Sequence, residues 1–187
     1  MSTPRAFTAS ITHDDPFAAG REAAEELLTE LGEAPELVLA HVAARLAPAR
    51  VIEGLYSLLP GSTRVVGCSS DCEISSEGAL TGTVTALGLR LGGIRAEPFI
   101  IAPSGRSSLE CGQRAGEALA PLAPDLVIAF PDVLQMNATQ FLLGMQGALG
   151  RGAPIVGGAP ADHGEFRSTT VFADRTVLSG AAAGVAL

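Results

Sequence analysis

Four residues with chemically useful side chains follow one predicted strand without a break. Cys68, Ser69, Ser70 and Asp71 come directly after the apolar run at 64–67. Their side chains and backbone amides could converge on a ligand, because open α/β sheets bind ligands beyond the carboxyl ends of their strands. The Cys68 thiol could also act as a nucleophile. A free cysteine is commonly a small buried apolar residue, so a packing role for Cys68 stays open beside both.

Two further loops follow predicted strands in the second half of the chain. Gly157 and Gly158 come after the run at 154–156, and glycines there allow either close approach to a ligand or tight packing between the halves. Asp132 follows the run at 126–130, where its carboxylate could bind a ligand amine or cap a turn. These residues are therefore candidates for the same ligand site.

Asp162 and His163 are the best histidine and carboxylate pair in the sequence. Because they are adjacent, their side chains tend to point in different directions, and we expect a surface pair rather than a catalytic dyad. Asp162 could still pair with a ligand amine. As an alternative, His163 would serve as the base for Cys68 in an enzyme that acts on an amide or an amino acid.

Two parts of the sequence echo each other and must position these loops. Residues 37–40 and 65–67 correspond to 126–129 and 155–157, an offset of about ninety residues, which suits a duplicated α/β half-domain better than a solenoid unit. We expect a single domain over 1–187, with half-repeats at roughly 15–102 and 103–187 packed around a pseudo-twofold axis. The loops that begin at Cys68 and Gly158 should then meet.

The element pattern predicts an α/β fold with mixed sheets. Capping residues and prolines place helix starts near Pro16, Pro48, Ser107 or Ser108, and Asn137. Short apolar runs predict strands at 37–42, 64–67, 97–102, 126–130 and 154–156. The closing stretch, 169–187, is predicted to form a C-terminal β-hairpin around a turn at 173–175.

The composition of the chain limits the kinds of partner that it can bind. The chain has 187 residues, of which 47% are hydrophobic and 17% charged, so it can bury a compact core. Its formal net charge is -8 and it has no basic run, which argues against nucleic acid and anionic membranes as partners. The N-terminus has no signal-peptide pattern. A small neutral or zwitterionic ligand, or a protein, fits this charge better.

The basic and sulfur-containing residues exclude several chemistries. Every basic side chain apart from histidine is arginine, so a lysine Schiff base, a pyridoxal phosphate anchor and a P-loop lysine are excluded. The cysteines Cys68, Cys72 and Cys111 form no C-x-x-C pair, and neither a disulfide framework nor a zinc site is indicated. We expect reduced thiols in the cytoplasm, with no cofactor and no metal.

Three segments resemble the N-terminal part of the FIST domain. They are Val-Val-Gly-Cys-Ser-Ser-Asp-Cys-Glu-Ile at 65–74, Phe-Pro-Asp at 130–132, and Ile-Val-Gly-Gly-Ala-Pro-Ala-Asp at 155–162. The resemblance implies an intracellular sensory domain that binds a small ligand, amino acids among them, and acts with bacterial signalling outputs such as histidine kinases or chemotaxis receptors. The family usually continues into a C-terminal half. An edge strand near Leu187 would then favour homo-oligomers.

These observations lead to one preferred interpretation, a non-catalytic cytoplasmic sensory domain with a pocket for a small molecule such as an amino acid. The expected ligand-binding residues are Cys68, Ser69, Ser70, Asp71, Asp132, Gly157, Gly158 and Asp162. Backbone amides around the two glycines would hold a carboxylate, and one of the three aspartates would pair with an amino group. The alternatives are the Cys68 enzyme and a protein-interaction scaffold without a ligand.

Overall fold

The computed structural model describes residues 3–75, 78–150 and 152–187, which form two α/β units. The first unit runs β1 (Arg5–Ile11), α1 (Pro16–Leu31), β2 (Leu37–Ala43), α2 (Pro48–Leu55), β3 (Arg64–Ser70), β4 (Glu73–Ser75), β5 (Gly78–Leu80) and β6 (Val84–Arg90). The second runs β7 (Glu97–Ile101), α3 (Ser108–Leu119), η1 (Ala120–Leu122), β8 (Val127–Pro131), α4 (Ala138–Leu149), β9 (Ile155–Gly157), β10 (Val171–Ala173), β11 (Thr176–Leu178) and β12 (Ala182–Ala186). The α/β class with mixed sheets is confirmed.

The two sheets share one connectivity. The larger has the order β1-β6-β2-β3-β10-β11, and the smaller has the order β7-β12-β8-β9. β2 pairs with β3 in parallel, as β8 does with β9, and an antiparallel strand (β6 or β12) lies on the other side of each parallel pair. The strand order β1-β6-β2-β3 is thus repeated in the smaller sheet. A duplication around a pseudo-twofold axis stays a prediction consistent with this order.

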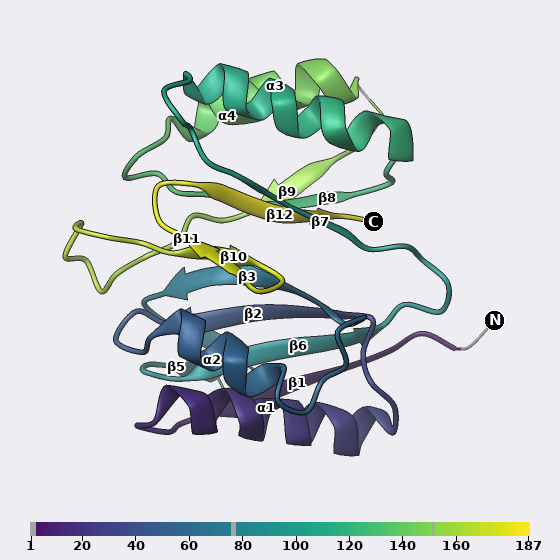
Figure 1. Cartoon of the computed structure of the whole chain (residues 1–187), viewed down its shortest axis with the longest axis vertical. Helices are drawn as coiled ribbons and strands as arrows, with labels where there is room; N and C mark the ends of the chain where they lie inside the picture. The colour runs from purple at the N-terminus through teal and green to yellow at the C-terminus, as the bar shows by residue number, and fades with distance from the viewer. Residues whose placement is uncertain (1–2, 76–77, 151) are drawn as a thin grey trace.

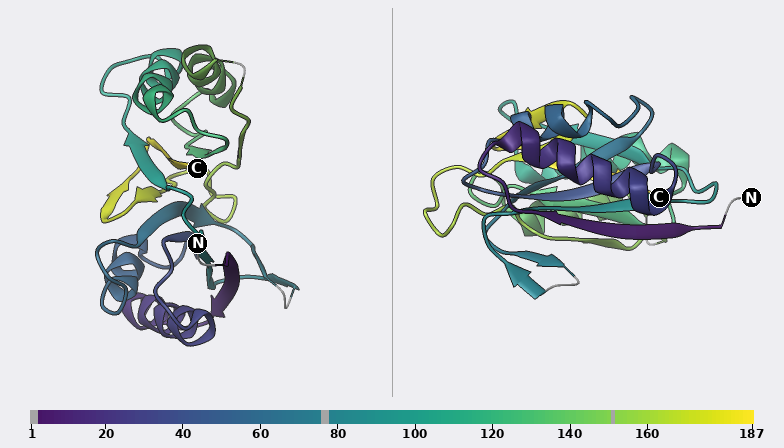
Figure 2. Two further views of the ribbon diagram at one scale, coloured as in Figure 1. Left: turned by 90° about the vertical axis from the view of Figure 1, so that its right-hand side faces the viewer. Right: turned by 90° about the horizontal axis from the view of Figure 1, so that it is seen from below.

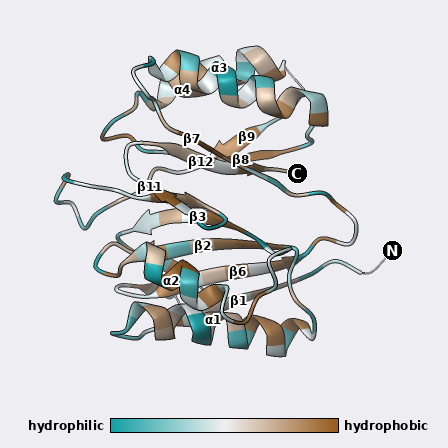
Figure 3. Ribbon diagram, viewed as in Figure 1, coloured by the Kyte–Doolittle hydropathy of each residue, from teal (hydrophilic) through white to brown (hydrophobic). Residues whose placement is uncertain are grey.

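The molecule has four layers, with two helices outside each of two stacked sheets (Figures 1 and 2). Alternate residues of a strand face opposite layers: Val38 of β2 packs with α1 and α2, whereas its neighbour Leu37 packs between the sheets. The central strands β2, β3 and β12 are buried on both faces and are mostly apolar, while the helices alternate between polar and apolar residues (Figure 3).

Helix starts follow the capping residues in the sequence. The Asp15 carboxylate accepts a hydrogen bond from the Phe17 amide at 2.9 Å, and the Asn137 side chain accepts one from the Gln140 amide at 3.0 Å. Ser107 forms a capping box with Glu110. These groups satisfy amides that the first helical turn leaves unpaired, and the predicted starts of α1, α3 and α4 are confirmed.

Each helix pair is in contact through glycine. A Cβ placed on Gly20 would lie 2.0 Å from the Val51 carbonyl oxygen, and one on Gly54 would lie 2.1 Å from that of Phe17. In the second unit, a Cβ on Gly144 would lie 2.1 Å from the Leu109 carbonyl oxygen. The backbones of α1 and α2, and of α3 and α4, therefore touch where a side chain would hold them apart.

The predicted C-terminal hairpin is shorter than expected. β10 and β11 form it around the turn at Asp174, and β10 pairs with β3, but β12 joins the other sheet between β7 and β8. Tyr56, after α2, holds the turn: its hydroxyl lies 3.0 Å from the Thr63 carbonyl oxygen and 3.2 Å from the Asp174 carboxylate. The Arg175 guanidinium stacks 4.1 Å from the centre of the Tyr56 ring.

Three other expectations differ from the structure. β1 begins before residue 15, where the first half-repeat was expected to start, and β7 lies within 15–102 yet pairs with β12 in the smaller sheet. The last strand is not an edge, because β12 has neighbours on both sides, so the edge expected near Leu187 was wrong. Across the described residues, no helix combines the length and apolar character that crossing a bilayer requires.

Candidate functional site

The predicted meeting of two loops forms a pocket between the sheets. A cavity of about 560 Å³ lies beside the carboxyl ends of β3 and β9, bounded by residues 68–72 on one side and by 157–159 with Ala161 on the other. Leu39, His41, Ile128 and Phe130 complete its wall. Of the expected ligand-binding residues, those present are Cys68, Ser69, Ser70, Asp71, Gly157 and Gly158.

Hydrogen bonds of Ser69 hold the two sides of the pocket together. Its hydroxyl donates to the Ala161 carbonyl at 2.9 Å and accepts from the Thr170 amide at 3.1 Å. Its backbone carbonyl also accepts from the Ala161 amide at 3.0 Å. Ser69 is buried and its hydroxyl is engaged in this way, so it shapes the pocket.

Cys68 belongs to β3, which is three residues longer than predicted. Its side chain points between the sheets and is buried, with Sγ 3.6 Å from Nδ1 of His41. The His41 ring packs edge-on against Phe130, with the ring centres 5.6 Å apart. The pocket therefore contains a cysteine and histidine pair, but the histidine is His41 and not His163.

Burial keeps this pair neutral. Desolvation raises the pKa of the Cys68 thiol to about 12. It also lowers the pKa of His41, and the negative charge of Glu73 opposes this shift only in part. A thiolate and imidazolium pair is therefore disfavoured, and Cys68 lacks the lowered pKa that marks nucleophilic cysteines.

A buried carboxylate supports the end of β3. Glu73 accepts a hydrogen bond from the Ser70 hydroxyl at 2.6 Å, and from the amide and hydroxyl of Thr83 at 3.1 and 2.9 Å. Ser70 lines the pocket, but its hydroxyl proton is committed to Glu73. The group orders the turn that carries Asp71 and Cys72.

Asp71 is the expected aspartate that lines the pocket. It is half-buried, and its carboxylate accepts a hydrogen bond from the His163 amide. A carboxylate accepts several hydrogen bonds, so one such contact leaves capacity for a ligand amine. Asp71 is thus the negatively charged side chain best placed for a ligand in this pocket.

Asp132 lies elsewhere, contrary to expectation. It is buried after β8, where one carboxylate oxygen accepts from the Leu134 amide at 3.0 Å and the other accepts from the Gly180 amide at 2.7 Å. The turn-capping alternative fits these contacts. Asp132 joins the loop after β8 to the loop before β12 and does not line the pocket.

Asp162 is likewise occupied in its own loop. Its carboxylate accepts hydrogen bonds from the amides of Ser168, Arg167 and Phe166, which lower its pKa. Asp162 and His163 line a separate hollow of about 230 Å³. Neither lines the pocket between the sheets, and the expected roles of Asp162 as a ligand and His163 as a base for Cys68 lose their geometric basis.

The two glycines of the site differ. Gly157 has φ 148°, and a Cβ there would lie 1.9 Å from the Ala129 carbonyl oxygen, so packing of β9 on β8 requires glycine. Gly158 has open space around it. Gly157 therefore serves close pairing of β9 with β8 within the second half of the chain, and not the packing between the halves that was one of the two expectations. Gly158 leaves its backbone accessible from the pocket.

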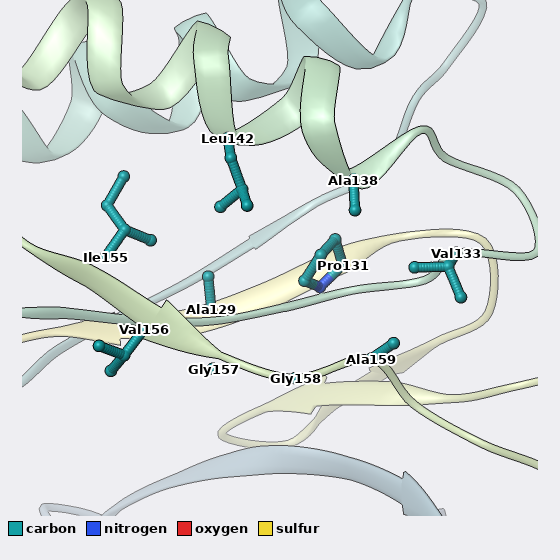
Figure 4. Close-up of a pocket in the computed structure, with 10 residues that line it drawn as sticks. All are labelled: Ala129, Pro131, Val133, Ala138, Leu142, Ile155, Val156, Gly157, Gly158 and Ala159. Atoms are coloured by element: carbon teal, nitrogen blue, oxygen red, sulfur yellow. The ribbon is translucent and has the colours of Figure 1, made fainter.

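A second cavity, of about 480 Å³, lies on the opposite face of β8 and β9, beneath α4 (Figure 4). Leu142 of α4 points toward the sheet, Ile155 of β9 points toward the helix, and the ring of Pro131, the last residue of β8, lies on the side that faces Ala138. The glycine segment at 157–159 lines both cavities. The second cavity is lined by uncharged residues alone.

His41 was not identified from the sequence, although a signal existed. The predicted strands at 37–42 and 64–67 pair in parallel, and the observed register places His41 opposite Cys68. Aligning the two strand starts and extending the second by one residue would have brought these side chains to one face.

Three or more histidine, cysteine or acidic residues grouped to hold a metal are not found within the described ranges.

Comparison with known proteins yields one family. The model of the FIST N domain matches residues 36–187, a range that contains both segments of the pocket between the sheets. A search of the curated proteins finds no match.

Proposed function

This chain belongs to the FIST domain family, and on that premise we propose that it is a sensory domain that binds an amino acid or a similar small zwitterion between its two sheets. The family supports a role in signal transduction. The proposal includes a cytoplasmic setting, in keeping with the free cysteines Cys68, Cys72 and Cys111. It also includes a signalling partner, such as a histidine kinase or a chemotaxis protein.

The observation that carries the proposal is the pocket at the ends of β3 and β9. Its volume of about 560 Å³ is in the range of small-molecule sites, and it combines an apolar wall with a few polar groups. It lies beyond the carboxyl ends of parallel strand pairs, the usual place for a ligand in open α/β sheets.

The chemistry of the wall suggests how such a ligand would lie. Asp71 would pair with the ammonium group, and the accessible backbone at Gly158 would contribute an amide to the carboxylate. Leu39, Ile128 and Phe130 would contact an apolar side chain. Of the three aspartates that the sequence offers as partners for the ligand ammonium, the proposal uses Asp71, which lines the pocket.

An enzyme that uses Cys68 is the second candidate, because Nδ1 of His41 lies 3.6 Å from Sγ of Cys68. The raised pKa of Cys68, about 12, and the lowered pKa of His41 both oppose formation of the reactive ion pair. The sensory role therefore has the better support.

The test is a thermal-unfolding screen of the protein against the standard amino acids. A ligand at about a hundred times its dissociation constant adds roughly 2.7 kcal/mol of stability, which raises Tm by several degrees in a domain of this size. Asp71→Asn should abolish that shift, because the variant loses the charge that pairs with the ligand ammonium.

Asp14→Asn is the matched control, since it removes the same charge from a fully exposed side chain. It should respond to the ligand as the parent does. A shift that survives in Asp71→Asn would move the ligand to another pocket, and no response to any amino acid would contradict the proposed ligand class.

A further inference from the structure

One edge of the larger sheet has no strand beside it. β1 ends the order β1-β6-β2-β3-β10-β11, and among the described strands β6 alone pairs with it, along all seven residues from Arg5 to Ile11. β1 lies beside α1 at the outside of the sheet (Figure 1). Both elements precede residue 36, where the match to the FIST N model begins. The family match therefore assigns no role to this surface.

The hydrogen bonds of β6 show which main-chain groups of β1 face the open edge. At the start of β6, the Thr83 carbonyl accepts from the Ala43 amide at 2.9 Å, on the side of β2. Because the main-chain groups of successive residues point to opposite sides of a strand, the even-numbered residues of β6 face β1. Their partners in the register are the odd-numbered residues of β1. The amides and carbonyls of Ala6, Thr8 and Ser10 therefore point away from β6.

An acidic hollow lies along this edge. It has a volume of about 380 Å³ and is bounded by Thr8 and Ser10 of β1 and by Glu25, Glu26 and Glu30 of α1. The three glutamates are exposed. One side of the hollow is thus a strand whose main chain can pair with a further strand, and the other side is a row of carboxylates that attracts cations.

The corresponding edge of the smaller sheet differs in both respects. β7 holds the place of β1 in the order β7-β12-β8-β9, but it contains Pro98, which has no amide to donate. The helix that follows it, α3, has two glutamates and one arginine, whereas α1 has four glutamates and one arginine. The acidic open edge is therefore a feature of the first unit and not of the repeated strand order.

Charge selects what can pair with this edge. The chain has a formal net charge of -8, so a second copy of it is repelled from the acidic hollow, whereas a basic segment is attracted. Glu26 and Glu30 are four residues apart, about 6 Å along the helix axis. Alternate residues of an extended strand are about 6.7 Å apart. Two basic residues separated by one position in a strand can therefore each meet one carboxylate.

We propose that the β1 edge is a docking site for a partner protein, which adds to the larger sheet an extended segment with lysine or arginine at alternate positions. The main chain of that segment pairs with Ala6, Thr8 and Ser10, and its basic side chains contact Glu26 and Glu30. In strand addition of this kind, main-chain hydrogen bonds give affinity and the alternate side chains give specificity. The proposal does not depend on a ligand between the sheets.

Fluorescence anisotropy with a labelled peptide tests the proposal. The probe is as long as β1, seven residues, and alternates lysine with threonine. It should bind, and a peptide with glutamate in place of each lysine should not. Glu26→Gln combined with Glu30→Gln should weaken binding of the probe about tenfold, because both carboxylates are lost. Glu117→Gln combined with Glu165→Gln is the matched control: it removes the same charge from exposed glutamates outside α1 and should bind as the parent does.

Hydrogen exchange shows whether the bound probe pairs as a strand. At saturation, the amides of Ala6, Thr8 and Ser10 should exchange more slowly, while those of the edge strands β7 and β9 should be unchanged. Failure of the lysine probe to bind, equal binding of the glutamate peptide, or undiminished binding to the double glutamine variant of α1 would overturn the proposal. Binding without protection of these three amides would overturn it as well, because charge alone would then hold the peptide.

Discussion

Cys68 shows how its surroundings decide what a thiol can do. The side chain lies between two sheets, and burial raises its pKa to about 12, so the thiol stays protonated at pH 8. The neighbouring His41 does not offset this, because burial lowers the pKa of the imidazole too. The pair packs as two neutral groups.

Alkylation distinguishes this state from an activated thiol. With iodoacetamide at pH 8, we expect Cys72, which is exposed, to be modified quickly, while Cys68 stays unmodified in the folded protein. Peptide mass spectrometry identifies the modified residue, and Cys72→Ser should remove the fast reaction. Rapid modification of Cys68 would favour the enzyme over the sensor.

His41 should make the protein less stable in acid. Its pKa is lowered in the folded state, so the unfolded chain binds the proton first as the pH falls below about 6.5. From there down to the folded pKa, the free energy of unfolding decreases by up to about 1.4 kcal/mol per pH unit.

Denaturant unfolding between pH 7.5 and pH 5 measures this loss. His41→Gln should lose less stability over the interval than the parent, because glutamine does not titrate. His163→Gln keeps the buried His41 and serves as the matched control for the loss of a histidine. Identical pH profiles for the parent and His41→Gln would contradict the argument.

At the scale of elements, glycine sets the distance between the helices of each pair. Gly144 lies against the Leu109 carbonyl oxygen, so Gly144→Ala must push α4 away from α3 and should cost about 1–3 kcal/mol of stability. Gly147 is in the same helix with open space around it, and Gly147→Ala should stabilise by about 1 kcal/mol, since alanine favours helix. Urea unfolding of both variants measures these opposite effects.

Short sequence patterns predicted where helices and strands lie better than they predicted which strands pair with one another. Asp15, Ser107 and Asn137 mark helix starts because a cap acts within a few residues. β12 was assigned to the hairpin because its place between β7 and β8 depends on contacts distant in the sequence. β1 was missed because its exposed residues near Arg5 interrupt the apolar pattern.

At the scale of the whole molecule, the repeated strand order explains what the sequence revealed about the site. The echo between 65–67 and 155–157 predicted that their loops meet, and these loops do line one pocket. The sequence could not show which aspartate is free to bind a ligand, because that depends on hydrogen bonds from backbone amides that lie outside the predicted strands. The Gly180 amide on Asp132 is one example.

The two units also share a core between their sheets. Val66 and Cys68 of the larger sheet pack in one cluster with Phe130 and Val185 of the smaller sheet. Apolar area buried between the units is lost if either unfolds alone. We therefore expect the units to unfold together.

Tyr56 gives that expectation an optical reporter. The chain has one tyrosine and no tryptophan, so its ultraviolet emission comes from a ring that contacts both Asp174 and Arg175 in the hairpin turn. Release of the hairpin from β3 would change the quenching of that ring. Coincidence of the emission change with the loss of far-ultraviolet circular dichroism would show one transition, whereas an earlier emission change would show that the hairpin detaches first and uncovers the edge of β3.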